Sequence, residues 1–132
     1  YFIKDGCPCS IEVEPLFHDL HKIYGDRIEV VGIFDKDREK ARQWHTDMLM
    51  KYKIVADPKH EIIRAYEIES SAFSVLISQD GKMVKMWPGY SRDILKEMNS
   101  LFAAEVGLKP KPFDTKYAPE RATTGCHFEL ES

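Results

Sequence analysis

The stretch DGCPCSIEVEP, residues 5–15, contains two cysteines one residue apart, Cys7 and Cys9, directly before a predicted helix. Such a pair can hold a soft metal ion, supply a reactive thiol, or fill a small buried space. The position favours a reactive thiol. Functional sites of open α/β sheets form beyond the carboxyl ends of the strands. The unpaired N–H groups at the start of a helix also favour an anion, which lowers the pKa of a cysteine placed there.

The elements that must place these cysteines follow from hydrophobic periodicity. In chain order they are a strand ending at residue 3, a helix over 11–24, a strand over 27–34, a helix reaching about 52, a strand over 52–58, a short helix near 62–66, strands over 73–78 and 82–87, and a helix over 92–106. Alternating strands and helices predict parallel strands with right-handed crossovers, and the turn at 79–81 adds an antiparallel hairpin. The predicted fold class is therefore α/β: a three-layer sandwich whose central mixed β-sheet is flanked by helices.

The last part of the chain differs from the rest. Its prolines, few aliphatic residues and lack of any period predict an irregular C-terminal tail. We therefore expect one domain over 1–107 and a Pro-containing tail over 108–132. Phe113, Tyr117 and Phe128 are the aromatic side chains expected to anchor this tail to the domain.

Composition excludes several classes of function. Of the 132 residues, 43% are hydrophobic and 31% are charged, as in an ordinary soluble domain. A net charge of −3 gives no sign of nucleic-acid binding. No apolar run approaches the length of a membrane span. We expect a soluble protein and favour the cytoplasm, while export stays open because the sequence does not begin with Met.

The chain resembles the thioredoxin-like superfamily, in particular the redoxin branch of thiol-disulfide oxidoreductases and alkyl-hydroperoxide-reductase-like (AhpC/TSA) thiol antioxidants. The resemblance covers about residues 1–106 and rests on CPCSIEVEP, on the order of the elements, and on the hairpin LISQDGKMVKMWPGYS. It implies a thioredoxin fold with a reactive cysteine at the head of the first helix. The family places a proline in this helix eight residues after the nucleophilic cysteine and five after the second one. Counting back from Pro15 makes Cys7 the nucleophile and puts Ser10 in the place of the second cysteine.

The resemblance also implies a substrate-binding surface made by Pro8, Ser10, Ala72 and Phe73. Ala72 stands at about the position where the family has a cis-proline, and a cis bond to a non-proline residue costs about 3 kcal/mol, so we expect a trans bond here. Peroxiredoxins carry a threonine three residues before their reactive cysteine, and this chain has Lys4 instead. That difference weakens the prediction of a specific peroxidase activity.

Two cysteines can resolve the oxidised form of Cys7. Cys9 is near in sequence, but a Cys-X-Cys disulfide closes a small strained ring. Cys126 lies in the tail, which is long enough to reach back across a small domain. Gly125 beside it would permit a close approach of the backbone. The candidate catalytic residues are therefore Cys7, Cys9 and Cys126.

The sequence thus predicts an enzyme, a thiol-disulfide oxidoreductase or thiol-dependent antioxidant, that uses Cys7 and no cofactor. Its partners would be a protein disulfide or a peroxide, together with a thiol reductant. One alternative is a peroxiredoxin-like peroxidase. Another is a non-enzymatic thioredoxin-fold module that binds Zn or Cu(I) through Cys7, Cys9, Cys126 and His127.

Overall fold

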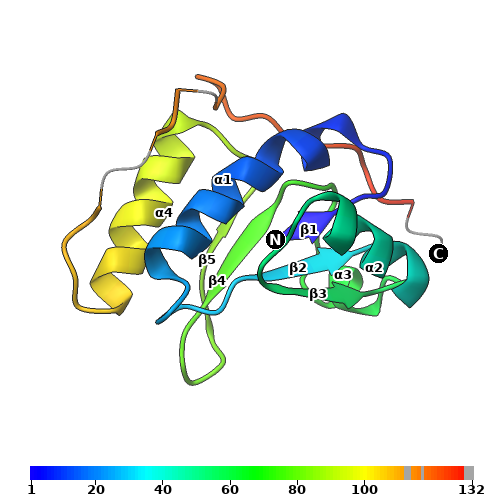
Figure 1. The fold of residues 1–132 in the computed structure, drawn as a ribbon, viewed down its shortest axis with the longest axis horizontal. Coiled ribbons are helices and arrows are strands. Elements are labelled where there is room, and N and C mark those ends of the chain that lie inside the picture. Colours follow the sequence, from blue (N-terminus) through cyan, green and yellow to red (C-terminus); the bar gives the residue numbers. More distant parts are fainter. Residues whose placement is uncertain (112–113, 117, 130–132) are drawn as a thin grey trace.

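The computed structural model describes residues 1–111, 114–116 and 118–129, and its helices and strands follow the predicted order (Figure 1). They are β1 (Phe2–Ile3), α1 (Pro8–Tyr24), β2 (Val31–Phe34), α2 (Arg38–Asp47), β3 (Lys53–Ala56), α3 (Glu61–Ala65), β4 (Ser74–Ile77), β5 (Met83–Trp87) and α4 (Arg92–Glu105). No helix in the described part of the chain is long and apolar enough to cross a membrane.

The strands form a parallel sheet and an antiparallel pair that adjoin at β1. β1 pairs with β2 and β2 with β3, both parallel, while β4 and β5 form an antiparallel pair. Two backbone hydrogen bonds join these two groups at β1: the Phe2 N–H donates to the Phe73 carbonyl over 3.0 Å, and the Ala72 N–H donates to the Phe2 carbonyl over 2.9 Å. The predicted parallel core with an antiparallel hairpin is therefore confirmed.

Helices cover both faces of the sheet and complete three layers (Figure 1). α1, α2 and α4 share the larger cluster of buried side chains, represented by Leu20, Trp44 and Met98. α3 packs on the opposite face, where Ile63 belongs to a second, smaller cluster. Since β2 and β3 each follow a parallel crossover in the same direction, right-handed connections put α1 and α2 on the same face.

The largest differences from the predicted boundaries are at the end of α2 and the start of β2. The apolar period predicted α2 to reach about Tyr52, but the helix ends at Asp47. Leu49 has a φ of 53°, a left-handed conformation that an α-helix does not contain. β2 begins at Val31 rather than at 27, because the preceding residues form a turn at the end of α1, with the Ile28 N–H bonded to the Tyr24 carbonyl over 2.8 Å.

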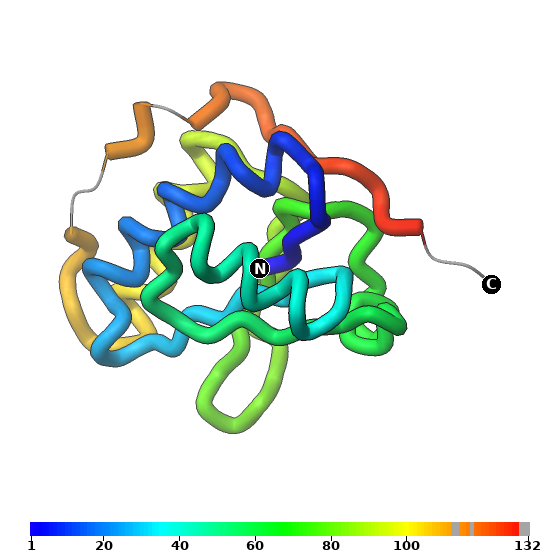
Figure 2. The backbone as a smooth tube through the Cα atoms, turned by 45° about the vertical axis from the view of Figure 1, so that its right-hand side comes forward, coloured from blue at the N-terminus to red at the C-terminus, as the bar shows by residue number. Residues whose placement is uncertain are grey.

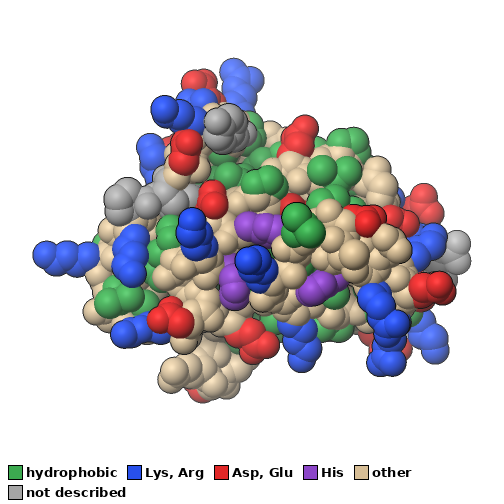
Figure 3. All heavy atoms as spheres, viewed as in Figure 1, with side chains coloured by type: hydrophobic (Ala, Val, Ile, Leu, Met, Phe, Trp, Pro, Cys, Tyr) green, Lys and Arg blue, Asp and Glu red, His purple; other side chains and the backbone are tan. Residues whose placement is uncertain are grey.

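A buried carboxylate fixes α1 against α2 and the segment before β3. Glu14 is 2% exposed and accepts hydrogen bonds from the Trp44 Nε1–H over 3.3 Å and from the Tyr52 hydroxyl over 3.2 Å. The rings of His18 and His21 pack on Tyr52, and histidine side chains gather on this face of the molecule (Figure 3). These histidines are therefore parts of the packing between α1 and the segment before β3.

The tail returns across the molecule beside the first turns of α4 and α1 (Figure 2). Arg92, the first residue of α4, donates from its backbone N–H to the Pro119 carbonyl over 2.9 Å and from its side chain to the carbonyls of Ala118 and Lys116 over 3.1 and 3.2 Å. Phe128 is 6% exposed and belongs to the smaller cluster, which confirms it as an anchor. The other two predicted anchors, Phe113 and Tyr117, lie outside the described residues.

Candidate active site

Cys7 stands where the chain passes from β1 into α1. It is the residue that caps the amino end of α1, and Pro8 occupies the first helical position, where its missing N–H costs no helical hydrogen bond. Gly6 has a φ of 76°, which a glycine adopts without strain and which turns the chain into the helix. The Cys7 side chain is only 1% exposed.

Four hydrogen-bond donors surround the Cys7 sulfur. The Ser71 hydroxyl lies 3.3 Å from it and the backbone N–H of Cys126 donates to it over 3.1 Å. The thiol of Cys126 also hydrogen-bonds to Cys7. The backbone N–H of Ser10, in the first turn of α1, acts on the same sulfur. These donors come from the loop before β4, the tail and α1.

Their combined effect is to favour the thiolate. Burial by itself raises the pKa of Cys7, but the hydrogen bonds from the Cys126 thiol, the Ser71 hydroxyl and the backbone of Cys126 and Ser10 outweigh it and lower the pKa from 9.0 to about 6. At neutral pH the sulfur is therefore mostly a thiolate. This agrees with the reactive thiol expected at the head of the helix.

Ser71 is a functional candidate that the sequence reasoning did not select. It is fully buried, and its hydroxyl is directed at Cys7. It stands next to Ala72, the position matched to the proline loop of the family, which packs against the reactive cysteine. Its place next to Ala72 could have indicated a role, but nothing else in the sequence distinguishes Ser71 from other serines in loops.

Replacing Ser71 by alanine should raise the pKa of Cys7. A hydrogen bond to a charged group is worth roughly 1.5–3 kcal/mol, so we expect a rise of about one pKa unit or somewhat more. The measurement is the rate of alkylation of Cys7 against pH in a protein whose other two cysteines are serine. With Ser71 present the rate should fall as the pH drops through about 6, and in Ser71→Ala the midpoint should move upward. An unchanged midpoint would remove Ser71 from the site.

The tail brings Cys126 to Cys7. The Ser71 N–H donates to the Cys126 carbonyl and the Gly125 N–H donates to the Ser71 carbonyl, both over 3.0 Å, so the two segments are paired along their backbones. A Cβ atom on Gly125 would overlap the Ser71 hydroxyl and lie 3.1 Å from the Ser71 carbonyl oxygen. The close approach expected for Gly125 is therefore present, and all three cysteines are reduced here.

Cys9 also contacts Cys7, from the first turn of α1. Burial, the nearby charges of Cys7 and Glu12, and the hydrogen bond to Cys7 raise its pKa, while a hydrogen bond with Tyr90 lowers it. The Tyr90 hydroxyl in turn donates to the Glu12 carboxylate over 3.0 Å. Cys9 thus lies between Cys7 and a tyrosine–glutamate pair.

The electrostatic surroundings distinguish the two candidate resolving cysteines. The hydrogen bond to Cys7 is the main cause that raises the pKa of Cys126, and the ammonium of Lys4 opposes it. Next to Cys9 the nearby charge is negative instead: the carboxylate of Glu12 raises the pKa of Cys9. A thiolate forms more readily next to a cation than next to a carboxylate, so Lys4 favours the thiolate of Cys126 while Glu12 opposes that of Cys9.

Ser10 and Lys4 hold the turn that carries Cys7. The Ser10 hydroxyl is buried and accepts a hydrogen bond from the Lys4 N–H over 3.1 Å. The Lys4 ammonium donates to the carbonyl of His127 over 2.8 Å. Where the family has a second cysteine, this chain therefore has a hydroxyl that fixes the backbone before Cys7.

The other predicted substrate-binding residues differ in exposure. Pro8 is exposed beside Cys7, whereas Ala72 and Phe73 are buried and bonded to β1. The described residues contain no cis peptide bond, and Ala72 has a φ of 66°. Ala72 and Phe73 can therefore influence a substrate only by positioning the preceding Ser71, and their role in substrate binding stays a prediction.

The metal alternative gains no support from the geometry. Among the residues that the structure describes, no three His, Cys, Asp or Glu side chains are grouped to hold a metal ion. His127 takes part in the site through its carbonyl, and its side chain is exposed. Cys7, Cys9 and Cys126 are thus arranged as interacting thiols.

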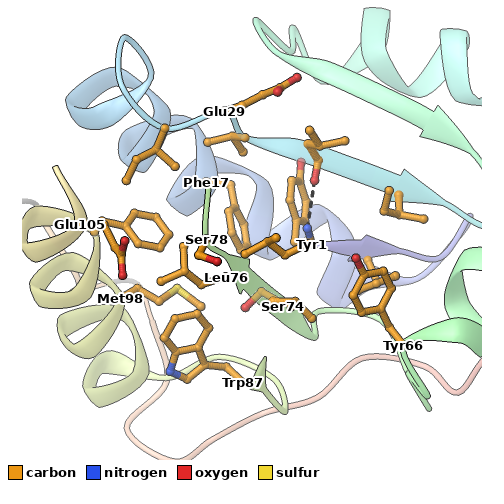
Figure 4. A pocket seen from close by; sticks show the side chains of 18 of the residues that line it. Tyr1, Phe17, Glu29, Tyr66, Ser74, Leu76, Ser78, Trp87, Met98 and Glu105 are labelled. Carbon is orange, nitrogen blue, oxygen red and sulfur yellow. Dashed lines mark hydrogen bonds between the residues drawn. The ribbon is translucent and has the colours of Figure 1, made fainter. Parts of the chain in front are cut away.

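A large cavity lies elsewhere in the molecule. It has a volume of about 600 Å³ and opens beside Tyr1, between the start of β2 and the end of β4, where the short β1 leaves these strands apart (Figure 4). Phe17, Leu76 and Met98 line it from α1, β4 and α4, and none of the three cysteines does. The chemistry at Cys7 is therefore separate from this cavity.

Comparison with solved structures defines the class of fold. A candidate thiol:disulfide interchange protein DsbE from Chlorobium tepidum is 19% identical over 80% of this chain and 77% of its own, with a TM-score of 0.72. An uncharacterized conserved protein from Geobacillus kaustophilus is 17% identical over 99% of this chain and 76% of its own, with a TM-score of 0.74. At these identities the likeness shows the fold, which is thioredoxin-like.

The family follows from the sequence. The chain belongs to the AhpC/TSA family, because the model of that family matches residues 1–99. The match includes Cys7, Cys9 and Ser71 and ends before the tail that carries Cys126. A comparison with the curated proteins finds no significant match. Family and site together indicate thiol-based redox chemistry.

Proposed function

We propose that the protein is a thiol-dependent oxidoreductase in which Cys7 is the nucleophile and Cys126 the resolving cysteine. One observation carries this proposal: the backbone N–H and the thiol of Cys126 both hydrogen-bond to the Cys7 sulfur. Two thiols held in contact, one of them with a pKa lowered to about 6, are arranged to form a disulfide with each other.

With a disulfide as substrate, the Cys7 thiolate attacks one sulfur atom and expels the other as a thiolate. The product is a mixed disulfide on Cys7. Cys126 loses its proton to the departing thiolate or to water and attacks the Cys7 sulfur, which releases the second half of the substrate. The substrate gains two electrons and the protein keeps a Cys7–Cys126 disulfide.

A hydroperoxide gives the same end state by a different first step. Cys7 attacks the terminal oxygen, the O–O bond breaks, and the alcohol or water leaves with a proton, so that Cys7 becomes a sulfenic acid. Attack by Cys126 then expels water and forms the same disulfide. The 1% exposure of Cys7 favours a small oxidant, and this observation supports the peroxidase alternative.

Exposure decides which sulfur an external reductant reaches. Cys126 is exposed while Cys7 is buried. A reductant thiolate therefore attacks the Cys126 sulfur and releases Cys7 as the thiolate. Because a thiol of low pKa is the better leaving group, the hydrogen bonds around Cys7 also favour this direction. A second reductant thiol then frees Cys126 and completes the cycle.

Thiol loss in the reduced protein tests the proposal. We expect hydrogen peroxide, or a small disulfide such as cystamine, to convert two thiols of each protein molecule into a disulfide. The second-order rate at pH 7 should exceed that of free cysteine about two- to threefold, because the larger thiolate fraction of Cys7 outweighs the lower nucleophilicity of a thiolate of low pKa. A rate equal to that of free cysteine with both oxidants would contradict the function.

A further inference from the structure

Part of the tail lies along the molecule as an extended segment beside Cys7. This docked segment comprises residues 123–128. Its backbone pairs with Tyr90 and with the Glu69–Ser71 loop. Thr123 and Tyr90 exchange two hydrogen bonds, each donating its N–H to the carbonyl of the other. At the loop, the Gly125 N–H donates to the Ser71 carbonyl, the Ser71 N–H to the Cys126 carbonyl and the Phe128 N–H to the Glu69 carbonyl. Each of these is 2.9 or 3.0 Å long. The docked segment thus occupies the backbone edge beside the nucleophile.

Glycines permit this close approach at two places. Gly89 has a φ of 98°, and a Cβ atom there would overlap the Thr123 carbonyl oxygen. At Gly125, a Cβ atom would overlap the Ser71 hydroxyl. Backbone lies directly against backbone or a short side chain at both positions, which leaves no room for another chain between the docked segment and its edge.

Anchors hold the docked segment at its far end. Phe128 inserts between Phe2, Ile63 and Phe73 in the smaller core cluster. The ammonium of Lys4 binds the neighbouring carbonyl of His127 over 2.8 Å. On the other side, Arg92 binds carbonyls of residues 116 and 118, ahead of the docked segment.

We propose that the docked segment determines the size of the molecules that react with Cys7, admitting small electrophiles and excluding protein disulfides for as long as it stays docked. The inference rests on the proposed function only in taking Cys7 as the nucleophile. A small reagent can reach the Cys7 sulfur when Cys126 alone moves away from it. A protein disulfide that pairs its backbone with this edge needs the N–H and carbonyl groups that the docked segment already uses, so the whole segment has to leave first.

The test uses two maleimides of different size on one thiol. In a Cys9→Ser/Cys126→Ser protein, Cys7 is the single thiol and the backbone pairing of the docked segment remains. N-ethylmaleimide and a maleimide on a long polyethylene glycol chain carry the same reactive group, so their rate ratio reports access alone. We expect the long reagent to react at least about tenfold more slowly than the small one in the folded protein, after normalisation to the rates in denaturant.

Removing the anchor should abolish that difference. Phe128→Ala should raise the rate of the long reagent at least about tenfold and change the rate of N-ethylmaleimide far less, because the core position that holds the segment is lost. The matched control is Glu129→Ala, which removes an exposed side chain next to Phe128 and keeps the backbone of the docked segment. It should leave both rates unchanged.

Gly125→Ala provides a second variant that leaves the core intact, should Phe128→Ala fail to fold. Its added methyl group collides with Ser71 and should release the docked segment with the same loss of size discrimination. Equal rates for both maleimides in the starting protein, or an unchanged ratio in the folded variants, would overturn the inference. Neither result depends on Cys126 as the resolving cysteine, so the proposed function is tested separately.

Discussion

Replacement of Cys7 by serine is expected to reduce the consumption of hydrogen peroxide, with dithiothreitol as reductant, to the rate seen without protein. Removing the nucleophile of a covalent mechanism costs roughly three orders of magnitude or more. Serine keeps the size and the hydrogen-bonding geometry, but its hydroxyl is not ionised near neutral pH. The thiolate that Ser71 and Cys126 stabilise is thereby lost, while the fold around it is kept.

Cys9→Ser is the matched control for this variant. It makes the same chemical change two residues away in the sequence, at a thiol whose pKa is raised rather than lowered. We expect Cys9→Ser to keep most of the wild-type rate. If Cys9→Ser abolished the reaction and Cys7→Ser preserved it, the nucleophile would be Cys9 and the assignment based on Pro15 would be wrong.

Replacement of Cys126 by serine is expected to separate the first step from the second. The backbone N–H of Cys126 still donates to Cys7, and a serine hydroxyl can replace the thiol as donor, so Cys7 should react with one equivalent of peroxide at close to the wild-type rate. Turnover should fall at least about tenfold, because an external thiol must replace a partner held at high effective concentration. Both rates can be measured, the first by rapid mixing and the second in the steady state.

The fate of Cys7 in the Cys126→Ser protein gives an independent readout. Without the resolving thiol, sulfenic acid should persist on Cys7 and be trapped by dimedone, detected by mass spectrometry. In wild-type protein and in Cys9→Ser the adduct should be scarce. Undiminished turnover in Cys126→Ser together with loss of turnover in Cys9→Ser would transfer the resolving role to Cys9.

The fold could be predicted because its determinants are local. Helical spacing of apolar residues, β-branched runs and the turn at 79–81 specify the order of the elements, and right-handed crossovers then fix the arrangement of the parallel strands. Pro15 lies inside α1 as expected and gave the register that singled out Cys7. The end of α2 was missed because Leu49, an exposed residue in a left-handed conformation, carries no recognisable stop signal.

The site could be predicted only in part, because it is assembled by contacts between distant parts of the chain. Cys7 was predicted because the sequence places it before a helix and because the resemblance puts the nucleophile eight residues ahead of Pro15. Ser71 was not, because its contact with Cys7 depends on how the loop before β4 meets β1. Cys126 was one of two candidates, and its proximity to Cys7 depends on Gly125, on Phe128 and on backbone pairing of the tail.

Oxidation of the protein is expected to join Cys7 and Cys126 in a disulfide. This bond can be detected by peptide mapping with mass spectrometry without reduction, after the reduced protein has received one equivalent of hydrogen peroxide and its remaining thiols have been alkylated. We expect a crosslink between the peptides that contain Cys7 and Cys126, with Cys9 alkylated. A Cys7–Cys9 disulfide with an alkylated Cys126, or a crosslink between two protein molecules only, would contradict it.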